Sequence, residues 1–281
     1  MNKEEKIAEI LSGIPQYEET IQDQKAKNKF GVSHAGEVAE WKRAVKRIHP
    51  GRMTMKIVEK HLVTEGECGI RLTRVDGEMP PFEAGQYITV HVPIDGQDLH
   101  QHYNIVSSPT EEGYFEISVF VEHKANKVSK YLAYDSKVGD TFSVGQPSGQ
   151  FVYNPVYQGN HLVFLAQDRG ITPFISMIRE KAFLGQDEKH ISLYYYDPAD
   201  YSLPYSEDLN DYMENIPNFN VSTLRLDTDE SWDSQIERII NNSEEDTTYY
   251  LSGNKHWEES GKEFLLDHDI KERKIRTQGK F

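Results

Sequence analysis

The sequence predicts a small antiparallel β-barrel followed by a doubly wound parallel α/β sheet, with a helical extension ahead of both. Short strands with alternating apolar residues and frequent turn signals fill residues 53–151, as in barrels and sandwiches. The stretch His161–Ile178 then changes abruptly from strand to helix periodicity. From there strands and helices alternate to the end of the chain, which is typical of a parallel sheet with right-handed crossovers. We therefore expect domains at residues 1–50, 51–155 and 156–281.

The composition argues against several classes of protein. A net charge of −15 and a pI near 5.2 argue against nucleic acid or an anionic membrane as the main partner. No apolar run approaches the roughly 20 residues of a membrane span, and the N-terminus lacks the apolar region of a signal peptide, so we expect a cytoplasmic protein. The single cysteine, Cys68, excludes an intrachain disulfide and a four-cysteine iron–sulfur cluster. Redox chemistry would therefore need an organic cofactor.

The 11 histidines show no metal-binding spacing such as H-E-x-x-H, so no metal site is expected. His100 and His102 are two residues apart and would share one face of a strand. This pair is compatible with a metal, but a polar loop edge is the simpler interpretation.

Residues 1–50 have a helical pattern with two amphipathic segments. The first is marked by Ile7, Ile10, Leu11 and Ile14, and the second, capped by Ser33, by Val38, Trp41, Val45 and Ile48. The helix around Trp41 also carries four basic residues, which are Lys42, Arg43, Lys46 and Arg47. These residues either form a docking surface for an acidic redox partner or complement the negative end of the helix dipole.

The barrel segment contains six expected strands, separated by turn signals such as Asp76-Gly77, Asp95-Gly96 and Glu112-Gly113. The strands are expected at 53–63, 69–75, 86–92, 101–108, 113–123 and 141–144. A short helical stretch from Val128 to Tyr134 interrupts them before the last strand.

The second sheet begins with His161–Ala166, a continuous apolar run that is typical of a parallel strand buried on both faces. Thr172 and Pro173 are expected as the N-cap and the first position of the helix that follows. The remaining elements are expected as strands at 191–197, 219–226, 248–252 and 274–277 and as helices at 205–213, 232–240 and 257–266.

The loop between this strand and its helix is where an anion is expected, because a helix N-terminus offers unpaired N–H groups and the positive end of the dipole. Close approach of the backbone to a phosphate normally needs glycines, yet the loop is Gln167-Asp168-Arg169-Gly170. At about 4 Å, Asp168 would repel a phosphate by about 1 kcal/mol in water and about 4 kcal/mol at an effective dielectric constant of about 20. Alternatively, its carboxylate occupies the anion position itself.

Three barrel stretches resemble the ferredoxin reductase superfamily, the FAD and NAD(P)H module also found in flavohaemoglobins and oxygenase reductases. They are PPFEAGQYITVHV at 80–92, HQHYNIVSSP at 100–109 and NKVSKYLAYDSKVGDTFSVGQPSGQF at 126–151. The second falls on the family motif R-x-Y-S, and the third on G-x-V-S-x-x-L followed by K-V-G-D and P-x-G-x-F. The resemblance covers residues 53 to 281 and implies a flavin-binding barrel of the six-stranded type with FAD as its cofactor.

In that family the arginine of R-x-Y-S neutralises the flavin pyrophosphate, the tyrosine packs on the isoalloxazine ring and the serine hydroxyl bonds near the ring. Here Gln101 takes the arginine position, Tyr103 is retained and Asn104 takes the serine position, with His102 inside the motif. The loss of a charge-assisted phosphate contact would cost about 1.5–3 kcal/mol of binding free energy. The alternative for Tyr103 is a core aromatic residue on a strand.

A second set of pyrophosphate contacts is implied by the stretch after residue 126. Ser129 and the amide groups of Lys127 and Val128 match the residues that hold the pyrophosphate in the family. The charge of Lys127 would partly compensate for the arginine that Gln101 replaces.

The nicotinamide motifs are the most altered. The family loop G-G-x-G-I-T-P keeps only Gly170, Ile171, Thr172 and Pro173, and the family motif C-G-P becomes Ser252, Gly253 and Asn254. The resemblance places Thr172 and Ser252 beside the nicotinamide. NADH is favoured over NADPH, because Tyr196-Asp197-Pro198 stands where NADP-dependent members often have a basic residue. The chain ends at Phe281, which would stack on the flavin ring or form a frayed end.

The resemblance implies an FAD-dependent oxidoreductase that passes electrons between NADH and a separate redox partner. Tyr103, Asn104 and Ser252 are the residues expected nearest to the chemistry. The alternative is a subunit that binds flavin or a partner protein and has lost the use of nicotinamide.

Overall fold

The computed structural model of the chain describes residues 51–121, 126–153, 159–185, 189–196, 203–224 and 231–279. The expected helices of the N-terminal extension, with the basic helix around Trp41, lie outside these residues, as do Asp197, Pro198 and Phe281. Domain boundaries are expected after residue 50 and after residue 155. The first lies at the edge of the described residues and the second lies outside them, so both stay predictions.

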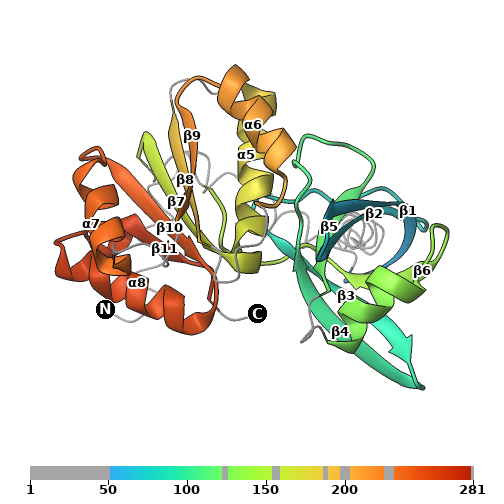
Figure 1. Cartoon of the computed structure of the whole chain (residues 1–281). Coiled ribbons are helices and arrows are strands. Elements are labelled where there is room, and N and C mark those ends of the chain that lie inside the picture. Colours follow the sequence, from blue (N-terminus) through green and yellow to red (C-terminus); the bar gives the residue numbers. More distant parts are fainter. Residues whose placement is uncertain are drawn as a thin grey trace, which may run out of the picture. The chain divides into compact units, whose positions relative to one another are not determined.

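A six-stranded antiparallel sheet forms the first half of the described chain (Figure 1). Its strands are β1 (Arg52–Thr64), β2 (Glu67–Arg74), β3 (Tyr87–Ile94), β4 (Gln97–Asn104), β5 (Phe115–Phe120) and β6 (Thr141–Gly145), paired in the order β4-β3-β6-β1-β2-β5. An isolated bridge between Ile105, just after β4, and Ile117 in β5 links the two edge strands. The expected antiparallel architecture is confirmed.

Alternation of apolar residues explains how this sheet buries one face. Met53, Met55 and Ile57 of β1 are buried, whereas the residues between them are exposed. The β3–β4 hairpin turns through Asp95 and Gly96, both at positive φ (53° and 75°), as a type I′ turn requires.

The helical stretch expected within this half is present as α4 (Lys127–Lys130) followed by one turn of π-helix, η1 (Tyr131–Asp135). The side chain of Asn126 caps α4 by accepting a hydrogen bond from the Ser129 N–H.

A five-stranded parallel sheet with the order β11-β10-β7-β8-β9 forms the second half. Its strands are β7 (His161–Gln167), β8 (His190–Tyr196), β9 (Phe219–Leu224), β10 (Thr247–Ser252) and β11 (Ile275–Thr277). The helices are α5 (Thr172–Leu184), α6 (Ser206–Asn215), α7 (Trp232–Asn241) and α8 (Lys255–Asp267), with short 3-10 turns at η2 (Asp168–Ile171) and η3 (Glu272–Lys274).

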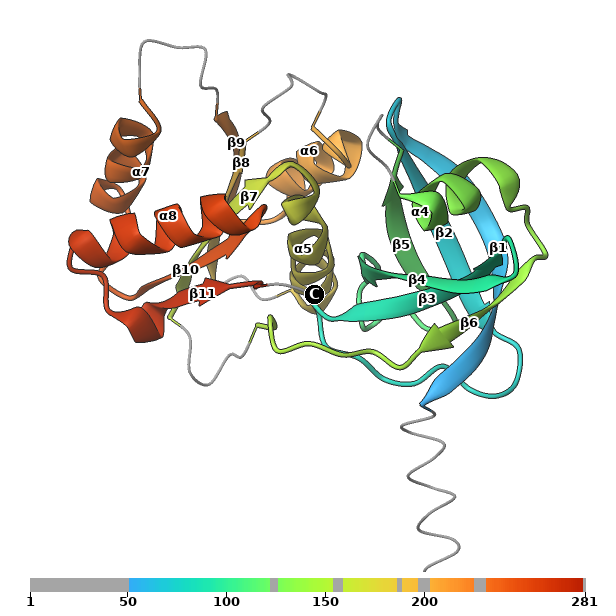
Figure 2. The same ribbon diagram turned by 90° about the horizontal axis from the view of Figure 1, so that it is seen from below.

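The helices cover both faces of this sheet. Figure 2 shows α5 and α6 on one face and α7 and α8 on the other. The apolar run of β7 serves both layers, because Leu162 and Phe164 join the core under α5 while Val163 and Leu165 join the core under α7 and α8. The expected doubly wound sheet is therefore confirmed.

Several boundaries differ from the expectation by a few residues, and two of these differences have a clear local cause. Strand β4 begins at Gln97 and ends at Asn104, because the two-residue turn lets Ile94 pair directly with Gln97. The N-cap of α5 is Ile171 and not Thr172, because η2 runs straight into the helix and Thr172 already has helical backbone angles.

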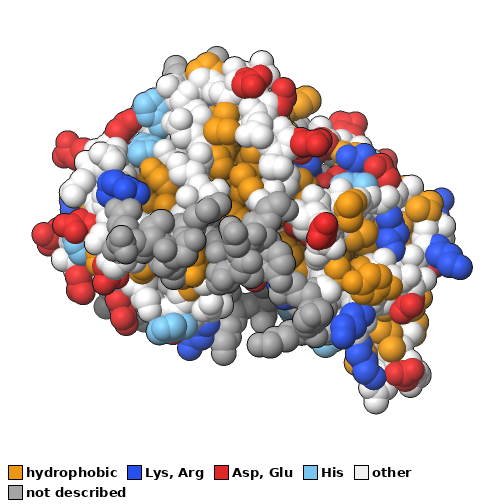
Figure 3. Space-filling model, viewed as in Figure 1, with side chains coloured by type: hydrophobic (Ala, Val, Ile, Leu, Met, Phe, Trp, Pro, Cys, Tyr) orange, Lys and Arg blue, Asp and Glu red, His pale blue; other side chains and the backbone are white. Residues whose placement is uncertain are grey.

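The histidine pair lies on β4 rather than on a loop edge, with the rings of His100 and His102 6.3 Å apart. The part of the chain that the structure describes contains no group of three or more metal-ligating side chains. None of its helices combines the length and apolar character that crossing a bilayer requires. On the face shown in Figure 3, acidic side chains are scattered over the surface and basic ones form no single continuous area, in keeping with the low pI.

Candidate functional site

A cavity of about 410 Å³ lies between the end of β4, the start of α4, the η2 turn and the loop after β10. Eight residues expected at a cofactor site line it, namely Gln101, His102, Tyr103, Asn104, Ser129, Gly170, Thr172 and Gly253. The structure therefore brings together segments of the chain that lie up to about 150 residues apart in the sequence. Lys127, Val128, Pro173 and Ser252 are not among the lining residues.

One wall of the cavity joins β4 to α4. The Tyr103 hydroxyl lies 2.9 Å from the Ser129 hydroxyl, and both residues are buried. Burial raises the pKa of Tyr103 to about 12, so its phenol stays protonated at neutral pH. Asn126 completes the wall, since its Nδ2 donates to Gln101 Oε1 over 2.9 Å. This bond leaves the amide nitrogen of Gln101 as the group that can donate toward a ligand.

Lys127 is placed differently from the role that the resemblance implies. Its exposed ammonium group pairs with Asp95 at 3.2 Å, in the β3–β4 turn. The amide groups of Lys127 and Val128 begin α4 and therefore have no acceptor within the helix.

The opposite wall is held by a chain of side-chain amides and hydroxyls. Asn104 Nδ2 donates to Thr172 Oγ1 over 2.8 Å, and Gln278 Nε2 donates to Asn104 Oδ1 over 2.7 Å. The Ser252 hydroxyl in turn donates to Gln278 Oε1 over 2.7 Å. Three residues expected at the site, Asn104, Thr172 and Ser252, thus belong to one network, and Gln278 connects them.

The two altered nicotinamide motifs pack directly against each other. A Cβ atom on Gly170 would lie 2.0 Å from the Ser252 carbonyl oxygen, so only glycine fits there. Gln167 Oε1 accepts hydrogen bonds from the Asn254 backbone N–H (3.1 Å) and from Asn254 Nδ2 (2.6 Å). Asn254 also caps α8. These contacts bridge the loops that the resemblance places beside a nicotinamide.

The backbone of the altered loop keeps a glycine-like conformation. Asp168 has φ = 51°, in the left-handed region that glycine enters without strain. Its carboxylate lies 3.9 Å from Arg169 Nε, and the N-cap residue of α5, Ile171, has no polar side chain of its own. The idea that Asp168 occupies an anion position at the helix N-terminus stays a prediction.

Arg169 brings a positive charge to the cavity. Its guanidinium carbon lies 5.5 Å from the centre of the Phe120 ring, and the charge acts on Tyr103 by lowering its pKa against the larger effect of burial. The side chain is 46% exposed, so a ligand in the cavity can reach it.

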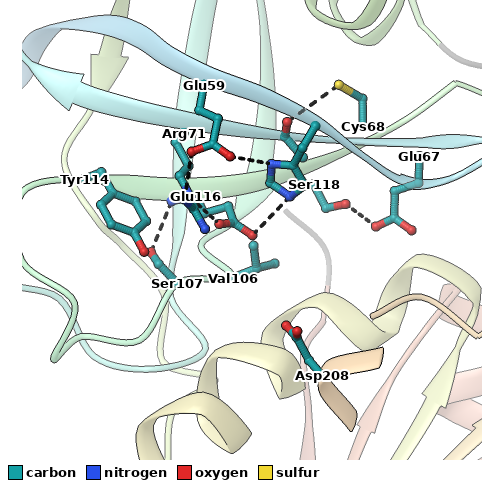
Figure 4. A network of polar contacts seen from close by, with 12 residues as sticks. Glu59, Glu67, Cys68, Arg71, Val106, Ser107, Tyr114, Glu116, Ser118 and Asp208 are labelled. Atoms are coloured by element: carbon teal, nitrogen blue, oxygen red, sulfur yellow. Dashed lines mark hydrogen bonds and ion pairs between the residues drawn. The ribbon is translucent and has the colours of Figure 1, made fainter. Parts of the chain in front are cut away.

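A buried ion-pair network ties β5 to α5 and α6. Glu116 is fully buried and accepts from Arg71 Nε (2.8 Å) and Arg179 Nη1 (3.1 Å), and Arg179 Nη2 reaches Asp208 (2.8 Å). Burial alone would raise the pKa of Glu116, but Arg179 and Arg71 hold it below its usual value. Figure 4 shows these carboxylates with Ser118 and Glu67 nearby.

Sequence reasoning missed Asn126, Arg169 and Gln278. The position of Asn126 carried a usable signal, because an asparagine just before a short helix is a preferred N-cap. Gln278 lies 174 residues from Asn104 in the chain and has no motif of its own.

Comparison with known proteins places these features in a family. Residues 55–153 match the model of the oxidoreductase FAD-binding domain. The chain is 27% identical over 194 residues to the plasma membrane-associated coenzyme Q6 reductase of Saccharomyces cerevisiae, covering 68% of this chain and 61% of that protein. It is 25% identical over 199 residues to an NADH-cytochrome b5 reductase 1 of Dictyostelium discoideum, covering 70% of this chain and 68% of that protein.

The fold of both halves is shared with solved structures. The flavohaem-like FAD/NAD-binding domain of a nitric oxide dioxygenase from Vibrio cholerae superposes with a TM-score of 0.66 at 18% identity, covering 80% of this chain and 97% of that one. The match to the first of the two reductases spans only about three fifths of its length. The family match of residues 55–153 and the shared fold of both halves agree with the resemblance to the ferredoxin reductase superfamily of FAD- and NAD(P)-binding oxidoreductases.

Proposed function

We propose that the protein is an FAD-dependent oxidoreductase that passes electrons from NADH to a separate redox partner. The observation that supports this most directly is the cavity that joins Tyr103 and Ser129 to Asn104 and Thr172. Tyr103, Asn104 and Ser129 stand at motif positions that the resemblance assigns to the flavin, and Thr172 stands at one that it places beside the nicotinamide. All four line one cavity.

The cavity fits part of an FAD molecule in size and in chemistry. Its volume of about 410 Å³ lies within the range of about 300–1,000 Å³ that is usual for small-molecule sites. Its donors are mostly neutral, from Gln101, Asn126 and Ser129, and Arg169 adds one cation. Such a set can bind an uncharged ring system and part of a pyrophosphate.

The residues would contact different parts of the FAD molecule, according to their position in the cavity. Tyr103 would pack on the ring, while Asn104, fixed by Thr172, would present a hydrogen bond to it. Gln101 and Ser129 would hold the pyrophosphate. When bound, FAD would accept a hydride and release single electrons, and the protein would orient it and tune its electronics.

The nicotinamide half supports NADH less directly. The pocket is lined by Gly170, Thr172 and Gly253, the glycines and threonine of the altered motifs. A second candidate function, a flavin subunit without nicotinamide chemistry, is favoured by the bridge between Gln167 and Asn254, which must open or be bypassed before a nicotinamide enters.

The absorption spectrum of the purified protein, recorded before and after anaerobic addition of NADH, separates the candidates. We expect a flavin spectrum that bleaches with NADH. A flavin spectrum that NADH leaves unchanged would favour the second candidate, and no flavin after addition of FAD would refute both.

Two variants test whether the loops limit NADH binding. Asp168→Gly combined with Gln167→Gly removes the carboxylate and the bridge, and NADH should bind more tightly. Asn254→Ser keeps an acceptor for the cap of α8 and removes the Nδ2 donor to Gln167 without adding a charge, so it should act in the same direction. Unchanged or weaker binding in both variants would contradict the idea that the loops obstruct the site.

The electron acceptor would be a separate protein. One of the two relatives is named for the protein cytochrome b5, and we propose a redox protein of comparable function here. The basic residues Lys42, Arg43, Lys46 and Arg47 would form its docking surface. Charge reversal at these four positions should abolish association in a pull-down from the native source, and intact association would refute the docking role.

A further inference from the structure

Glu67 lies between the flavin cavity and a second hollow on the outside of the sheet. On the inner side, the hydroxyl of Ser118, which lines the cavity, donates a hydrogen bond to Glu67 Oε1 (Figure 4). On the outer side, Glu67 lines an open hollow of about 280 Å³ together with Lys60, Glu65 and Cys68. Only 1% of the residue is exposed. Glu67 thus lines the outer hollow and reaches the flavin cavity through Ser118, without being part of the bulk surface.

The carboxyl group of Glu67 is incompletely satisfied. Among the described residues, Oε2 has no hydrogen-bond partner although it is buried. A buried carboxylate that lacks partners is costly, so its neutral form is favoured. Burial raises the pKa of Glu67 to about 7, the hydrogen bond from Ser118 opposes this rise, and the charge of Asp168 adds to it.

The charged and titratable groups that face Glu67 come from both halves of the chain. In the α/β half, the charge of Asp168 of η2 raises the pKa of Glu67, and Glu67 in turn raises the pKa of the buried phenol of Tyr205. Cys68 is its neighbour on β2, and the ammonium group of Lys60 acts on Cys68 from the outer hollow. No arginine or lysine of the described chain forms an ion pair with Glu67 that would hold it ionised.

We propose that Glu67 carries protons between the flavin cavity and the outer hollow through the hydroxyl group of Ser118. The inference rests on the proposed function, because the protons in question are those that a bound flavin takes up or releases. It concerns two residues that lie outside the motifs discussed above.

The transfer requires only a reversal of one hydrogen bond. When Glu67 is ionised, the Ser118 hydroxyl donates to it and presents lone pairs to the cavity. When Glu67 is protonated, its O–H donates to Ser118 Oγ, and the Ser118 hydrogen is free to point into the cavity. A proton that leaves Ser118 toward the cavity is replaced by the Glu67 proton, and Glu67 is then reprotonated by water in the outer hollow.

The test uses the full chain loaded with FAD. The bound flavin is reduced by a light flash with a photoreductant, and proton uptake is followed with an indicator dye between about pH 6 and about pH 8. We expect Glu67→Gln and Ser118→Ala each to slow proton uptake about tenfold, and the double variant to be no slower than either, because both residues serve one path. Glu112→Gln, an exposed glutamate in a turn, should match the unaltered protein.

Unchanged proton uptake in Glu67→Gln with FAD bound would overturn the relay and leave the proposed function intact. A chain that binds no FAD would refute the proposed function, and the relay with it. A second measurement needs no flavin, namely ¹³C NMR of the glutamate carboxyl groups. One resonance should titrate near pH 7 and be absent from Glu67→Gln, and its absence from the unaltered protein would also overturn the relay.

Discussion

The buried carboxyl group of Glu67 should make the stability of the protein depend on pH. Its pKa is about 7 in the folded chain against an ordinary value of 4.5. Between these two values the folded state holds a proton that the unfolded state has lost, so the free energy of unfolding falls as pH rises through this window. A difference of about 2.5 pKa units at 1.36 kcal/mol per unit corresponds to about 3 kcal/mol, lost in full above about pH 7.

Glu67→Gln removes this penalty because glutamine stays neutral at every pH. Near pH 4 the variant should resemble the unaltered protein, whose Glu67 is then protonated. Near pH 8 it should be more stable by up to about 3 kcal/mol. Urea unfolding followed by tryptophan fluorescence at several pH values measures the difference. Glu112→Gln is the control and should show no such trend, since that residue is exposed.

Two further variants move the effect in opposite directions. Ser118→Ala removes the hydrogen bond that lowers the pKa of Glu67 and should shift the pH window upward. Asp168→Asn removes a charge that raises this pKa and should shift the window downward. A stability difference between Glu67→Gln and the unaltered protein that is constant from pH 4 to pH 8 would refute the assignment.

Four other outcomes follow from the residues that line the cavity and those that support it. Arg169→Gln should weaken FAD binding about tenfold in a fluorescence titration, because it removes the cation of the cavity, and the loss should be smaller at high salt. Gln101→Arg should strengthen FAD binding, because it adds a cation. Arg179→Met should lower the free energy of unfolding by about 3 kcal/mol in urea, since it leaves Glu116 buried with one cation fewer. Gly170→Ala should destabilise by about 1–3 kcal/mol, because its Cβ would collide with the backbone carbonyl at the end of β10. An unaffected FAD affinity, or either stability within about 0.5 kcal/mol of the unaltered chain, would contradict the corresponding argument.

The fold could be predicted because its signals are local. The apolar run of β7 and the apolar helical stripe after it predict a strand-to-helix crossover unit, and Asp95-Gly96 predicts a hairpin. Errors arose where local signals compete. Thr172 and Pro173 look like a helix start, but the preceding 3-10 turn already supplies the helical geometry, so the cap lies one residue earlier.

Only those site residues that lie within a recognisable sequence motif could be predicted. Tyr103 and Ser129 were found because each lies in a recognisable stretch, and their contact is shown by the structure. Gln278 and Glu67 were not found, since their roles arise from pairing with residues distant in the sequence. A buried glutamate at the start of a strand has the same local pattern as an exposed one.

The altered loop is more consistent with rebuilding than with decay. Asp168 keeps the left-handed backbone conformation, which aspartate enters more readily than most non-glycine residues because its short side chain can bond the local backbone. The substitution therefore preserves the backbone geometry of the loop. The Asp168 carboxylate lies beside Arg169, which brings the cation of the cavity, and it also raises the pKa of Glu67 across the cavity. The replacement of glycine by aspartate therefore links the loop electrostatically to both groups, and the charge at this site lies on the loop instead of at Gln101.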